Sequence, residues 1–504
     1  MLRVRRALVS VWDKKGLVDF AKKLAQFQIE IISTGKTASL LKRSGIPSQE
    51  VSSLTSFPEI LSGRVKTLHP KIFGGILANK KHPLHMEEIR SLGMPPFDMV
   101  VVNLYPFADK LREGLGWDEM MEYIDIGGVS LLRAGAKNYK NVACISTPSQ
   151  YKFVLEELEK NKGFLPEPAL KKLAIDVFLL TKEYDNSIYN YFRRKKILSW
   201  DLERVAPLRY GENPHQQAGL YRLVSKPSVA YSQIQGKDFS FNNFLDIDAA
   251  FRCVREFNEP AAAIVKHASL CGVGVDRKLA GAYRKAVAVD PISSFGGIIS
   301  FNRKVDKETA TQVLKSGFKE CVIAPFYSKE ALKIFSSKKN LRVVEIDFLY
   351  KPDTLDIRAT SFGYLIQEQD IGTLEKGKLK VVTKRKPTQR ELKDLLLGWK
   401  VVKHTKSNAI VVIKNSSVLG IAGGRPSRVG AVKDACNAAI KSSQGAVLAS
   451  DGFFPKEDSI KLAHRKGIKA VIQPGGSLKD REIIACCNRC NIAMVFTGIR
   501  HFRH

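Results

Sequence analysis

Short apolar runs alternate with amphipathic periods along the first 200 residues. The segment "RALVSVW" predicts a strand, and apolar residues then recur at every third or fourth position over residues 17–24, which predicts a helix. The runs "IEIIST" and "FDMVVVNLYPF" predict two further buried strands, the second ended by Pro106. Strands that alternate with helices predict a parallel sheet with helices on its faces, whose ligands bind at the carboxyl ends of the strands.

The character of the chain changes near residue 200, where a basic helix end gives way to polar sequence with prolines and glycines. We predict a domain boundary there, with one domain at residues 1–198 and a second at 199–504. The second domain again mixes strands with helices, which predicts another α/β fold. The charged stretch "FYSKEALKIFSSKKNLR" is a candidate separator of two subdomains, although no repeat is evident between their residues.

Composition narrows the class of protein. A chain of 504 residues with 44% hydrophobic and 26% charged residues predicts a globular protein of several domains. Apolar runs too short for a membrane helix, and a basic start soon interrupted by polar residues, predict a cytoplasmic protein without a membrane partner. The eight cysteines predict reduced thiols, and "CCNRC" is interpreted as part of a helix that runs into a strand rather than as a zinc site, so we expect no catalytic metal.

The net charge is +31, from 81 Lys and Arg against 50 Asp and Glu. Such an excess can attract nucleic acid or smaller polyanions. The basic residues are spread along the chain without an RNA-binding motif, so we expect no nucleic-acid partner. The simpler interpretation is a solvated basic surface that steers anionic substrates.

Two stretches of the first domain carry candidate chemistry. The end of "IISTGKT" resembles a P-loop, but Glu30 stands where that loop needs its first glycine. Ser33, Thr34 and Gly35 end a strand and open a helix, so they either bind a phosphate at the helix N-terminus or form an ordinary helix cap. In "SGRVKTLHP", an extended segment would place Arg64 and the lysine two residues later on one face, which suits a phosphate or a developing oxyanion.

A candidate acid–base set follows in the same domain. Tyr105 ends a strand, Asp125 precedes a Gly–Gly turn, and Lys137 comes one helix later. Together with the lysine of "SGRVKTLHP", these groups could move protons, but their spacing in the sequence does not give the distances between them.

The second domain has two further candidates. "LRYGENPHQ" carries Arg209 and Tyr210 in a segment too rich in Pro and Gly for a core. "AAAIVKHASLCGVG" places Lys266 and His267 at the end of a buried strand, before a tight turn predicted at its Cys–Gly pair and a helix whose apolar face spans residues 279–287. A lone histidine is usually structural, but a Lys–His pair at a strand end favours proton transfer.

Nine motifs along the chain resemble one known family. In order they are "SGRVKTLHP", "NLYPF", "YIDIGG", "LRYGENPHQ", "FNNFLDIDAA", "DPISSFGG", "KSNAIV", "VIQPGGS" and "FTGIRHFRH". Essentially the whole chain is similar to the bifunctional purine-biosynthesis family that joins AICAR transformylase to IMP cyclohydrolase.

This resemblance implies an α/β fold and two reactions. Residues 1–198 would be an IMP cyclohydrolase domain with a methylglyoxal-synthase-like parallel α/β fold, and residues 199–504 an AICAR transformylase domain of two cytidine-deaminase-like subdomains. The transformylase would move a formyl group from the co-substrate 10-formyltetrahydrofolate, a folate, to AICAR, and the cyclohydrolase would close FAICAR to IMP with loss of water. A homodimer with transformylase sites across its interface and no tightly bound cofactor are also implied, and a structural potassium ion is left open.

The resemblance also assigns roles in the transformylase. His267 would be the base or proton shuttle, Lys266 the partner of the oxyanion or of the leaving nitrogen, and Asn408 a residue near the formyl group. The implied substrate-binding residues are Arg209, Tyr210, Phe295, Gly296, Asp451, Arg500 and His504.

In the cyclohydrolase, the resemblance implies that Lys66, Tyr105, Asp125 and Lys137 assist ring closure. The implied phosphate and ribose contacts are Ser10, Lys14, Ser33, Thr34, Gly35, Arg64 and Thr67, together with Lys66.

Three places depart from the usual pattern of the family. Ser269 and Leu270 replace an Asn–Pro pair after Lys–His, Arg425 stands where glutamine is common, and Lys36 replaces the second glycine of S-T-G-G-T. The alternative prediction is therefore a cyclohydrolase with a weakened transformylase or one with an altered formyl donor.

Overall fold

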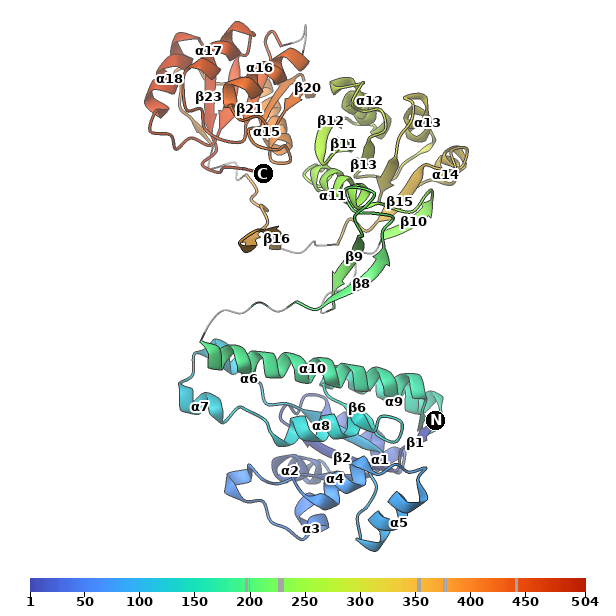
Figure 1. Cartoon of the computed structure of the whole chain (residues 1–504). Coiled ribbons are helices and arrows are strands. Elements are labelled where there is room, and N and C mark those ends of the chain that lie inside the picture. The colour runs from blue at the N-terminus through green and yellow to red at the C-terminus, as the bar shows by residue number, and fades with distance from the viewer. Residues whose placement is uncertain are drawn as a thin grey trace. The chain divides into compact units, whose positions relative to one another are not determined.

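The structure is a computed structural model that describes the chain except residues 195–197, 199, 225–230, 351–354, 375, 376, 378 and 440–442. The chain divides into two compact units, Met1–Ser199 and Trp200–His504 (Figure 1). The boundary predicted between residues 198 and 199 adjoins a residue outside the described part of the chain. Among the described residues, no helix is both long and apolar enough to cross a membrane.

The first unit is built on a five-stranded parallel sheet with the order β4-β3-β2-β5-β6, as the sequence predicted. Its strands are β2 (Arg6–Val11), β3 (Glu30–Ser33), β4 (Gln49–Glu50), β5 (Met99–Asn103) and β6 (Ala143–Ile145), and a separate antiparallel pair joins β1 (Leu2–Arg3) to β7 (Phe164–Leu165). Successive side chains alternate between the faces, with Val9 and Val101 in one core cluster and Leu8 and Val100 in another. Both faces are therefore buried, which explains the continuous apolar runs.

Helices cover both faces of this sheet (Figure 1). α1 (Leu17–Gln26), α2 (Gly35–Arg43) and α9 (Tyr151–Lys160) pack on one face, and α4 (Pro70–Leu77), α8 (Gly127–Lys137) and the middle of α10 (Glu167–Arg193) pack on the other. The remaining helices are α3 (Val51–Thr55), α5 (Pro83–Ser91), α6 (Phe107–Glu113), α7 (Trp117–Met121) and the 3₁₀ turns Leu61–Gly63 and Pro148–Gln150.

The second unit contains two six-stranded sheets with the same strand order, β10-β15-β14-β13-β11-β12 and β18-β23-β22-β21-β19-β20. The first half comprises β10 (Tyr231–Gln235), α11 (Phe241–Val254), β11 (Ala261–Lys266), β12 (Ser269–Val275), α12 (Leu279–Val289), β13 (Ile298–Phe301), α13 (Lys307–Lys315), β14 (Cys321–Ala324), α14 (Lys329–Phe335) and β15 (Arg342–Ile346). The second half comprises β18 (Lys380–Val381), α15 (Gln389–Val402), β19 (Ile410–Lys414), β20 (Ser417–Ala422), α16 (Arg428–Ala438), β21 (Val447–Ser450), α17 (Asp458–Arg465), β22 (Ala470–Gln473), α18 (Asp480–Arg489) and β23 (Ala493–Phe496).

The two halves repeat each other in detail. Each has an antiparallel hairpin, β11–β12 or β19–β20, whose first strand pairs antiparallel with the first of three parallel strands. Each hairpin has a register shift at the same place, between Ile264 and Val265 or between Val412 and Ile413. The duplication is therefore structural, although the sequence shows no evident repeat.

Two predictions about this unit were wrong. The stretch "FYSKEALKIFSSKKNLR" lies inside the first half, where it forms α14 and its flanks, and the halves are joined by the segment between β15 and β18. The Cys271–Gly272 pair lies within β12 and is not a turn. A Cβ atom at Gly272 would lie 1.9 Å from the carbonyl oxygen of Ala286, so this glycine allows α12 to pack closely on the strand.

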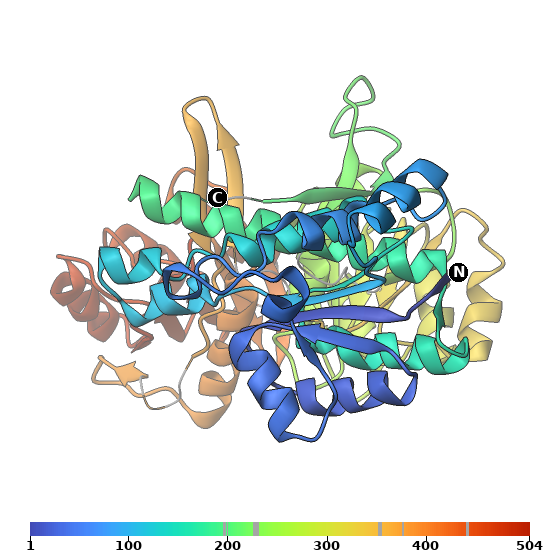
Figure 2. The same ribbon diagram turned by 90° about the horizontal axis from the view of Figure 1, so that it is seen from below.

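A shared core joins the two halves. Buried residues of both hairpins, among them Val265 and Val411, belong to one cluster with Trp399 of α15. Two separate hairpins, β8 (Leu202–Pro207) with β9 (Gly219–Leu223) and β16 (Leu355–Thr360) with β17 (Gly363–Glu368), are largely exposed. Figure 2 shows the β16–β17 hairpin projecting from the rest of its unit.

Candidate functional site

Lys266 and His267 lie at the tip of the β11–β12 hairpin, at the carboxyl end of β11. Lys266 pairs with Ser269, so His267 and Ala268 are the two turn residues, and both have a left-handed φ of 54°. Lys266 Nζ donates a hydrogen bond of 2.9 Å to the carbonyl oxygen of Phe295, whose side chain is 56% exposed. The adjacent Gly296 donates its N–H to the carbonyl of Phe318. The structure thus brings the Lys–His pair together with the predicted loop residues Phe295 and Gly296.

Asp246 of α11 holds this turn. Its carboxylate accepts hydrogen bonds from the backbone N–H groups of Ala268 and His267. Burial raises the pKa of Asp246, although these two hydrogen bonds and the proximity of His267 lower it in part. The sequence prediction missed Asp246, but the motif "FNNFLDIDAA" contains it, and a carboxylate in an otherwise apolar helix face is a usable signal.

Asn408 lies immediately before β19 in a network of hydrogen bonds. Arg428 Nη2 donates to Asn408 Oδ1 over 2.6 Å, and Asn408 Nδ2 donates to the carbonyl of Arg425 over 2.9 Å. Arg428 also forms an ion pair with the fully buried Asp451. The network brings together the predicted residues Asn408 and Asp451 and fixes the orientation of the Asn408 amide.

The sequence prediction missed Arg428. This arginine is the first residue of α16 and is only 6% exposed. A positive charge is unfavourable at a helix N-terminus, so an arginine in that position indicates an interaction outside the helix.

The C-terminal residues lie beside the Asn408 network. The Arg500 guanidinium lies over the Phe502 ring at 4.3 Å, and the His504 carbonyl accepts a hydrogen bond of 2.9 Å from Arg358. Phe502, which lies between Arg500 and His504 in the sequence, lines a cavity of about 430 Å³. The other lining residues are Asn408, Pro426, Ser427, Arg428, Val429, Phe453, Pro455, Lys456, Asp458 and Ser459. The substrate-binding roles of Arg500 and His504 stay predictions.

The remaining predicted pair of this unit, Arg209 and Tyr210, stands by itself. The guanidinium of Arg209 lies 5.3 Å from the centre of the Tyr210 ring, and the Arg209 N–H donates to the Phe239 carbonyl. No hydrogen bond or ion pair among the described residues joins this pair to the Lys266 group or to the Asn408 group. Within one chain, the predicted transformylase residues therefore form three separate groups.

In the first unit, three lysines gather at the carboxyl ends of β2 and β3. Burial, and to a smaller extent the nearby charges of Lys66 and Lys36, lower the pKa of Lys14 to about 8. Lys14 Nζ donates to Thr37 Oγ1 over 2.9 Å. A cluster of three cations suits an anionic group such as a phosphate. The departure at Lys36 thus adds a cation to the predicted phosphate site.

Of the other predicted phosphate contacts, some lie at the start of α2 and one is buried in the sheet. The Ser10 and Thr34 hydroxyls lie 3.0 Å apart at the start of α2, and a Cβ atom at Gly35 would lie 2.9 Å from a carboxylate oxygen of Glu59. Ser33 is fully buried, and its hydroxyl donates a hydrogen bond to the Val9 carbonyl, so Ser33 links β3 to the neighbouring strand β2.

Asp125, Tyr105 and Lys66 lie together. Asp125 Oδ1 accepts the Gly128 N–H over 2.7 Å. Burial raises the pKa of Asp125, whereas the N–H groups of Gly128 and Tyr105 and the charge of Lys66 lower it in part. A Cβ atom at Gly128 would lie 2.4 Å from the Asp125 carboxylate, which explains the Gly–Gly pair: it is the first turn of α8.

The structure places only one of the three remaining predicted residues beside the Asp125 group: Thr67, and not Arg64 or Lys137. A Cβ atom at Gly127 would lie 3.1 Å from Thr67 Oγ1, so Thr67 adjoins the Asp125 group. Arg64 follows a 3₁₀ turn and pairs with Glu122, so the segment is not the extended one that the sequence suggested. Lys137 is the exposed last residue of α8, about 15 Å of helical rise from Gly127, and the structure does not bring it to Asp125.

Sequence reasoning also missed an aromatic contact in this group. The rings of Trp12 and Tyr105 are 4.8 Å apart, and Trp12, at 47% exposure, also contacts Tyr123. Asn103 fixes the Trp12 segment, since its side chain accepts from the N–H groups of Trp12 and Asp13.

Metal-binding side chains are dispersed. Within the described part of the chain, no group of three or more His, Cys, Asp or Glu side chains could hold a metal ion. Cys486 and Cys487 are buried in α18, which leads into β23, as "CCNRC" was interpreted. The potassium ion, for which backbone carbonyls can serve as ligands, stays a prediction.

Two protein families match this chain. The family described as AICARFT/IMPCHase bienzyme matches residues 135–438, and the MGS-like domain matches residues 16–130. This chain belongs to the AICARFT/IMPCHase bienzyme family. The resemblance carried by the nine motifs is thereby confirmed, as is the α/β fold with an MGS-like N-terminal domain.

Curated relatives of this bienzyme family match over almost the whole chain. The bifunctional purine biosynthesis protein PurH of Caldicellulosiruptor bescii is 48% identical over 515 residues, with 99% of this chain and 100% of the relative covered. The protein of the same name from Aquifex aeolicus is 48% identical over 514 residues, and that from Bacillus cereus 46% over 512 residues, with the same coverage.

Proposed function

We propose that this chain catalyses both reactions of its family. The unit Trp200–His504 transfers the formyl group of 10-formyltetrahydrofolate to AICAR, and the unit Met1–Ser199 closes the resulting FAICAR to IMP. The observation that carries the proposal is the Lys266–His267 pair. It lies at a hairpin turn whose backbone N–H groups donate hydrogen bonds to the Asp246 carboxylate. The eight free cysteines support a reducing compartment, and we place the protein in the cytoplasm.

In formyl transfer, the aromatic 5-amine of AICAR is a weak nucleophile. His267 removes its proton as the amine attacks the formyl carbon. The Lys266 ammonium stabilises the oxyanion that forms and protonates the leaving nitrogen of the folate. One of its three N–H bonds is directed to the Phe295 carbonyl, which positions the ammonium and leaves two N–H bonds for the substrate.

Asn408 binds the formyl group with an amide of fixed orientation. Arg428 binds its oxygen and the Arg425 carbonyl accepts from its nitrogen, so the amide loses little freedom when substrate binds. The second N–H of Asn408 Nδ2 makes a longer hydrogen bond of 3.3 Å to the Pro426 carbonyl. We assign this N–H to the formyl oxygen, which takes the place of the Pro426 carbonyl when substrate binds.

We infer a homodimer in which the transformylase site is completed by the partner. Two observations support it: the groups of Lys266 and Asn408 share no hydrogen bond among the described residues, and the β8–β9 and β16–β17 hairpins are largely exposed. Strand pairs without a covered face are uncommon in a monomer.

A complementation assay tests the dimer. His267→Asn and Asn408→Ala chains are unfolded together, refolded and assayed for formyl transfer. If the site crosses the interface, mixed dimers hold one intact site, and about a quarter of the wild-type activity returns. No recovery in a mixture shown to exchange subunits, or a fully active monomer, would contradict the inference.

Ring closure is intramolecular, so positioning supplies much of the rate. We assign Lys14, Lys36 and Lys66 to the phosphate of FAICAR. Asp125, with its raised pKa, and Tyr105 exchange protons at the closing ring. Because the pKa of Lys14 is about 8, its positive charge is lost above that pH and FAICAR binding weakens there. Lys36→Gly removes a neighbouring charge, so the loss of binding moves to higher pH, which a KM–pH profile measures.

The two reactions are tested together and then apart. Purified protein is given AICAR with 10-formyltetrahydrofolate, and the release of tetrahydrofolate and the formation of IMP are followed. Both products are expected. IMP formed only from supplied FAICAR would favour the alternative, a cyclohydrolase with a weakened transformylase or an altered formyl donor.

Ser269 and Leu270 motivate that alternative, and their packing bears on it. Leu270 is 8% exposed in the core shared by both halves, and the Ser269 hydroxyl donates to the His267 carbonyl over 3.3 Å. Both residues therefore contribute to the hairpin, which supports a working transformylase.

A further inference from the structure

A second cavity of about 1040 Å³ lies within the larger unit, and it shares no lining residue with the groups assigned to either reaction. Its wall comes from residues 256–260 before β11, residues 275–277 around the end of β12, residues 372–374 and the helix α15. Because it adjoins the beginning of β11, it lies about 16 Å along that strand from Lys266. It is large enough for a ligand of nucleotide size.

The wall of this cavity has an excess of positive charge. Five cations line it, Arg277, Lys285, Lys393, Lys400 and Lys403, against the three carboxylates Glu256, Glu259 and Asp276. Lys403 pairs with Glu256 at 2.9 Å, and Lys285 pairs with Asp276 at 2.8 Å.

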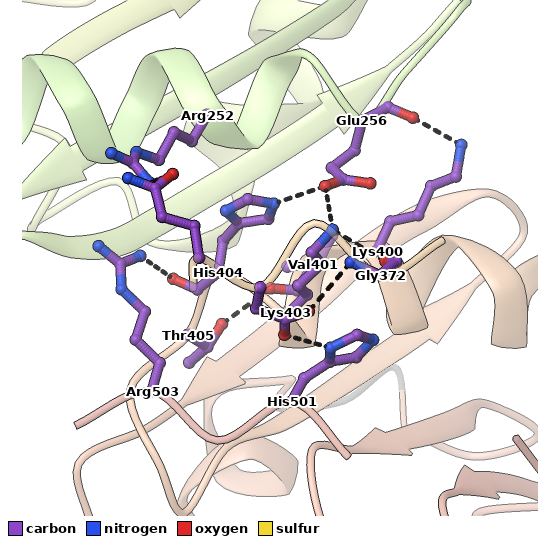
Figure 3. A network of polar contacts seen from close by, with 12 residues as sticks. Arg252, Glu256, Gly372, Lys400, Val401, Lys403, His404, Thr405, His501 and Arg503 are labelled. Atoms are coloured by element: carbon purple, nitrogen blue, oxygen red, sulfur yellow. Dashed lines mark hydrogen bonds and ion pairs between the residues drawn. The ribbon is translucent and has the colours of Figure 1, made fainter. Parts of the chain in front are cut away.

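The other three cations of the wall, Lys400, Arg277 and Lys393, are not neutralised by a carboxylate of the part of the chain that the structure describes. Lys400 donates to the backbone carbonyl of Glu256, as Figure 3 shows, and not to a carboxylate. Arg277 and Lys393 are exposed and form no ion pair with any residue that the structure describes. These two side chains are therefore free to bind an anion.

Much of the rest of the cavity wall is apolar, which suits the binding of an aromatic or heteroaromatic ring. It contains Phe257, Pro260, Val275, Leu374, Leu396, Leu397 and Trp399. The Trp399 side chain is 3% exposed, and its indole N–H has no acceptor among the described residues. A buried donor without a partner is an unusual feature of a protein interior.

The duplicated fold gives Arg277 a counterpart. Arg277 lies ten residues after the turn residue His267, and Arg425 lies ten residues after the turn residue of the other hairpin. The Arg425 backbone anchors Asn408 at the start of β19. Arg277 and the lining residues before β11 therefore take, in the first half, the place where the second half carries its proposed formyl-binding residue.

We propose that this cavity binds an organic anion: an aromatic or heteroaromatic ring that carries a phosphate or a carboxylate. Arg277 and Lys393 bind the anionic group, and the ring packs against Phe257, Leu397 and the other apolar side chains. This site is separate from the substrate sites, and the proposal does not depend on the proposed function.

Hydrogen–deuterium exchange of the full-length protein tests the site, because it locates binding even when a probe also enters the substrate sites. The probes are adenosine 5′-monophosphate for a phosphate and N-(4-aminobenzoyl)-L-glutamate for a carboxylate, with neutral adenosine as the control. We expect at least one anion to slow exchange at residues 256–260 and 372–374, while adenosine does not.

Variants make the test specific. The double substitution Arg277→Ala with Lys393→Ala is expected to weaken this protection by at least about tenfold in probe concentration. Lys333→Ala, which removes an exposed lysine of α14 outside the cavity, is expected to leave it unchanged. Unaltered thermal unfolding of all three proteins shows that the variants fold.

Three results would overturn the proposal. They are the absence of protection by both anions at millimolar concentration, equal protection by adenosine, and protection that survives the double substitution. Protection by only one of the two anions identifies the class of anionic group that the site accepts.

Discussion

The two halves of the larger unit have the same topology but different residues at one hairpin turn. Lys266 donates to the carbonyl of the residue three positions before β13, and Lys414 donates to the carbonyl of Gln444, three positions before β21. The lysine contact therefore belongs to the fold. The residue after each lysine differs, since it is His267 in one half and Asn415 in the other.

The support behind the turn is also repeated. Asp246 and Asp394 are each the sixth residue of their helices, α11 and α15. Each carboxylate accepts two backbone N–H groups of the facing turn. Asn415 and the next residue have the same positive φ as His267 and Ala268. The comparison teaches that the backbone conformation, the lysine and the aspartate stabilise both turns. Only the first turn also carries a general base, because only it has a histidine.

The largest expected effect comes from converting one turn into the other. His267→Asn places in the first turn the residue of the second, and asparagine accepts a left-handed backbone. We expect formyl transfer to fall by about 10²–10⁴-fold, since a general base is lost, with closure of supplied FAICAR unchanged. Both steps are measured by kcat. Asn415→His is the control and should leave both steps unaltered; a His267→Asn enzyme with normal formyl transfer would refute the assigned role.

The second prediction concerns two residues at equivalent positions that contact each other. Glu256 and His404 each follow their helix by two residues, and Glu256 Oε1 lies 3.1 Å from His404 Nε2 (Figure 3). Burial alone would raise the pKa of Glu256, but hydrogen bonds from His404 and Lys403 bring it down to about 2. Burial lowers the pKa of His404, so its neutral ring donates the hydrogen bond.

Because the pKa of Glu256 is lowered by folding, its stabilising effect is present above about pH 4.5 and is lost as the pH falls toward 2. We expect Glu256→Gln to reduce the free energy of unfolding by about 3 kcal/mol at pH 7 and by less than half of that at pH 3. Urea unfolding at both pH values measures this. Glu259→Gln, at an exposed neighbour, is the control, and a pH-independent loss in Glu256→Gln would contradict the prediction.

The third prediction separates support from chemistry. Asp246→Ala and Asp394→Ala each leave two turn N–H groups without their acceptor, so each should destabilise the unit by about 1–3 kcal/mol in urea. Only Asp246→Ala should also lower formyl transfer, because only its turn carries a base. An equal loss of activity in both variants would mean that the two turns contribute alike.

The smallest effect is expected at the two counterpart arginines. Arg425 pairs with Asp434 at 2.6 Å, but its side chain is 57% exposed. An exposed ion pair contributes about 0–1 kcal/mol, so Arg425→Gln should shift the unfolding midpoint little. Arg277→Gln, which breaks no ion pair with a described residue, is the matched control. A large loss in Arg425→Gln alone would show that this departure from the family pattern supports the Asn408 segment.

Local patterns account for what could be read from the sequence. Uninterrupted apolar runs with helical periods between them predicted the parallel sheet of the first unit, since both of its faces are buried. The same reasoning placed Lys266 at the end of β11, but it put the turn at a Cys–Gly pair because glycine usually marks turns. In β12 the glycine instead meets α12, a contact that local sequence does not contain.

The sequence by itself determined the family, the α/β class and the candidate catalytic and binding residues. It could do so because motifs and hydrophobic periodicity are patterns of residues that are close together in the sequence. Only the tertiary structure decided which residues meet. The hydrogen bonds of Arg428 with Asn408, of Lys14 with Thr37 and of Asp246 with the His267 turn all join residues 20 or more positions apart. The residues of the larger unit show no evident repeat, and it is the strand order and the turn contacts that show its duplication, because topology and burial can repeat where the side chains have diverged.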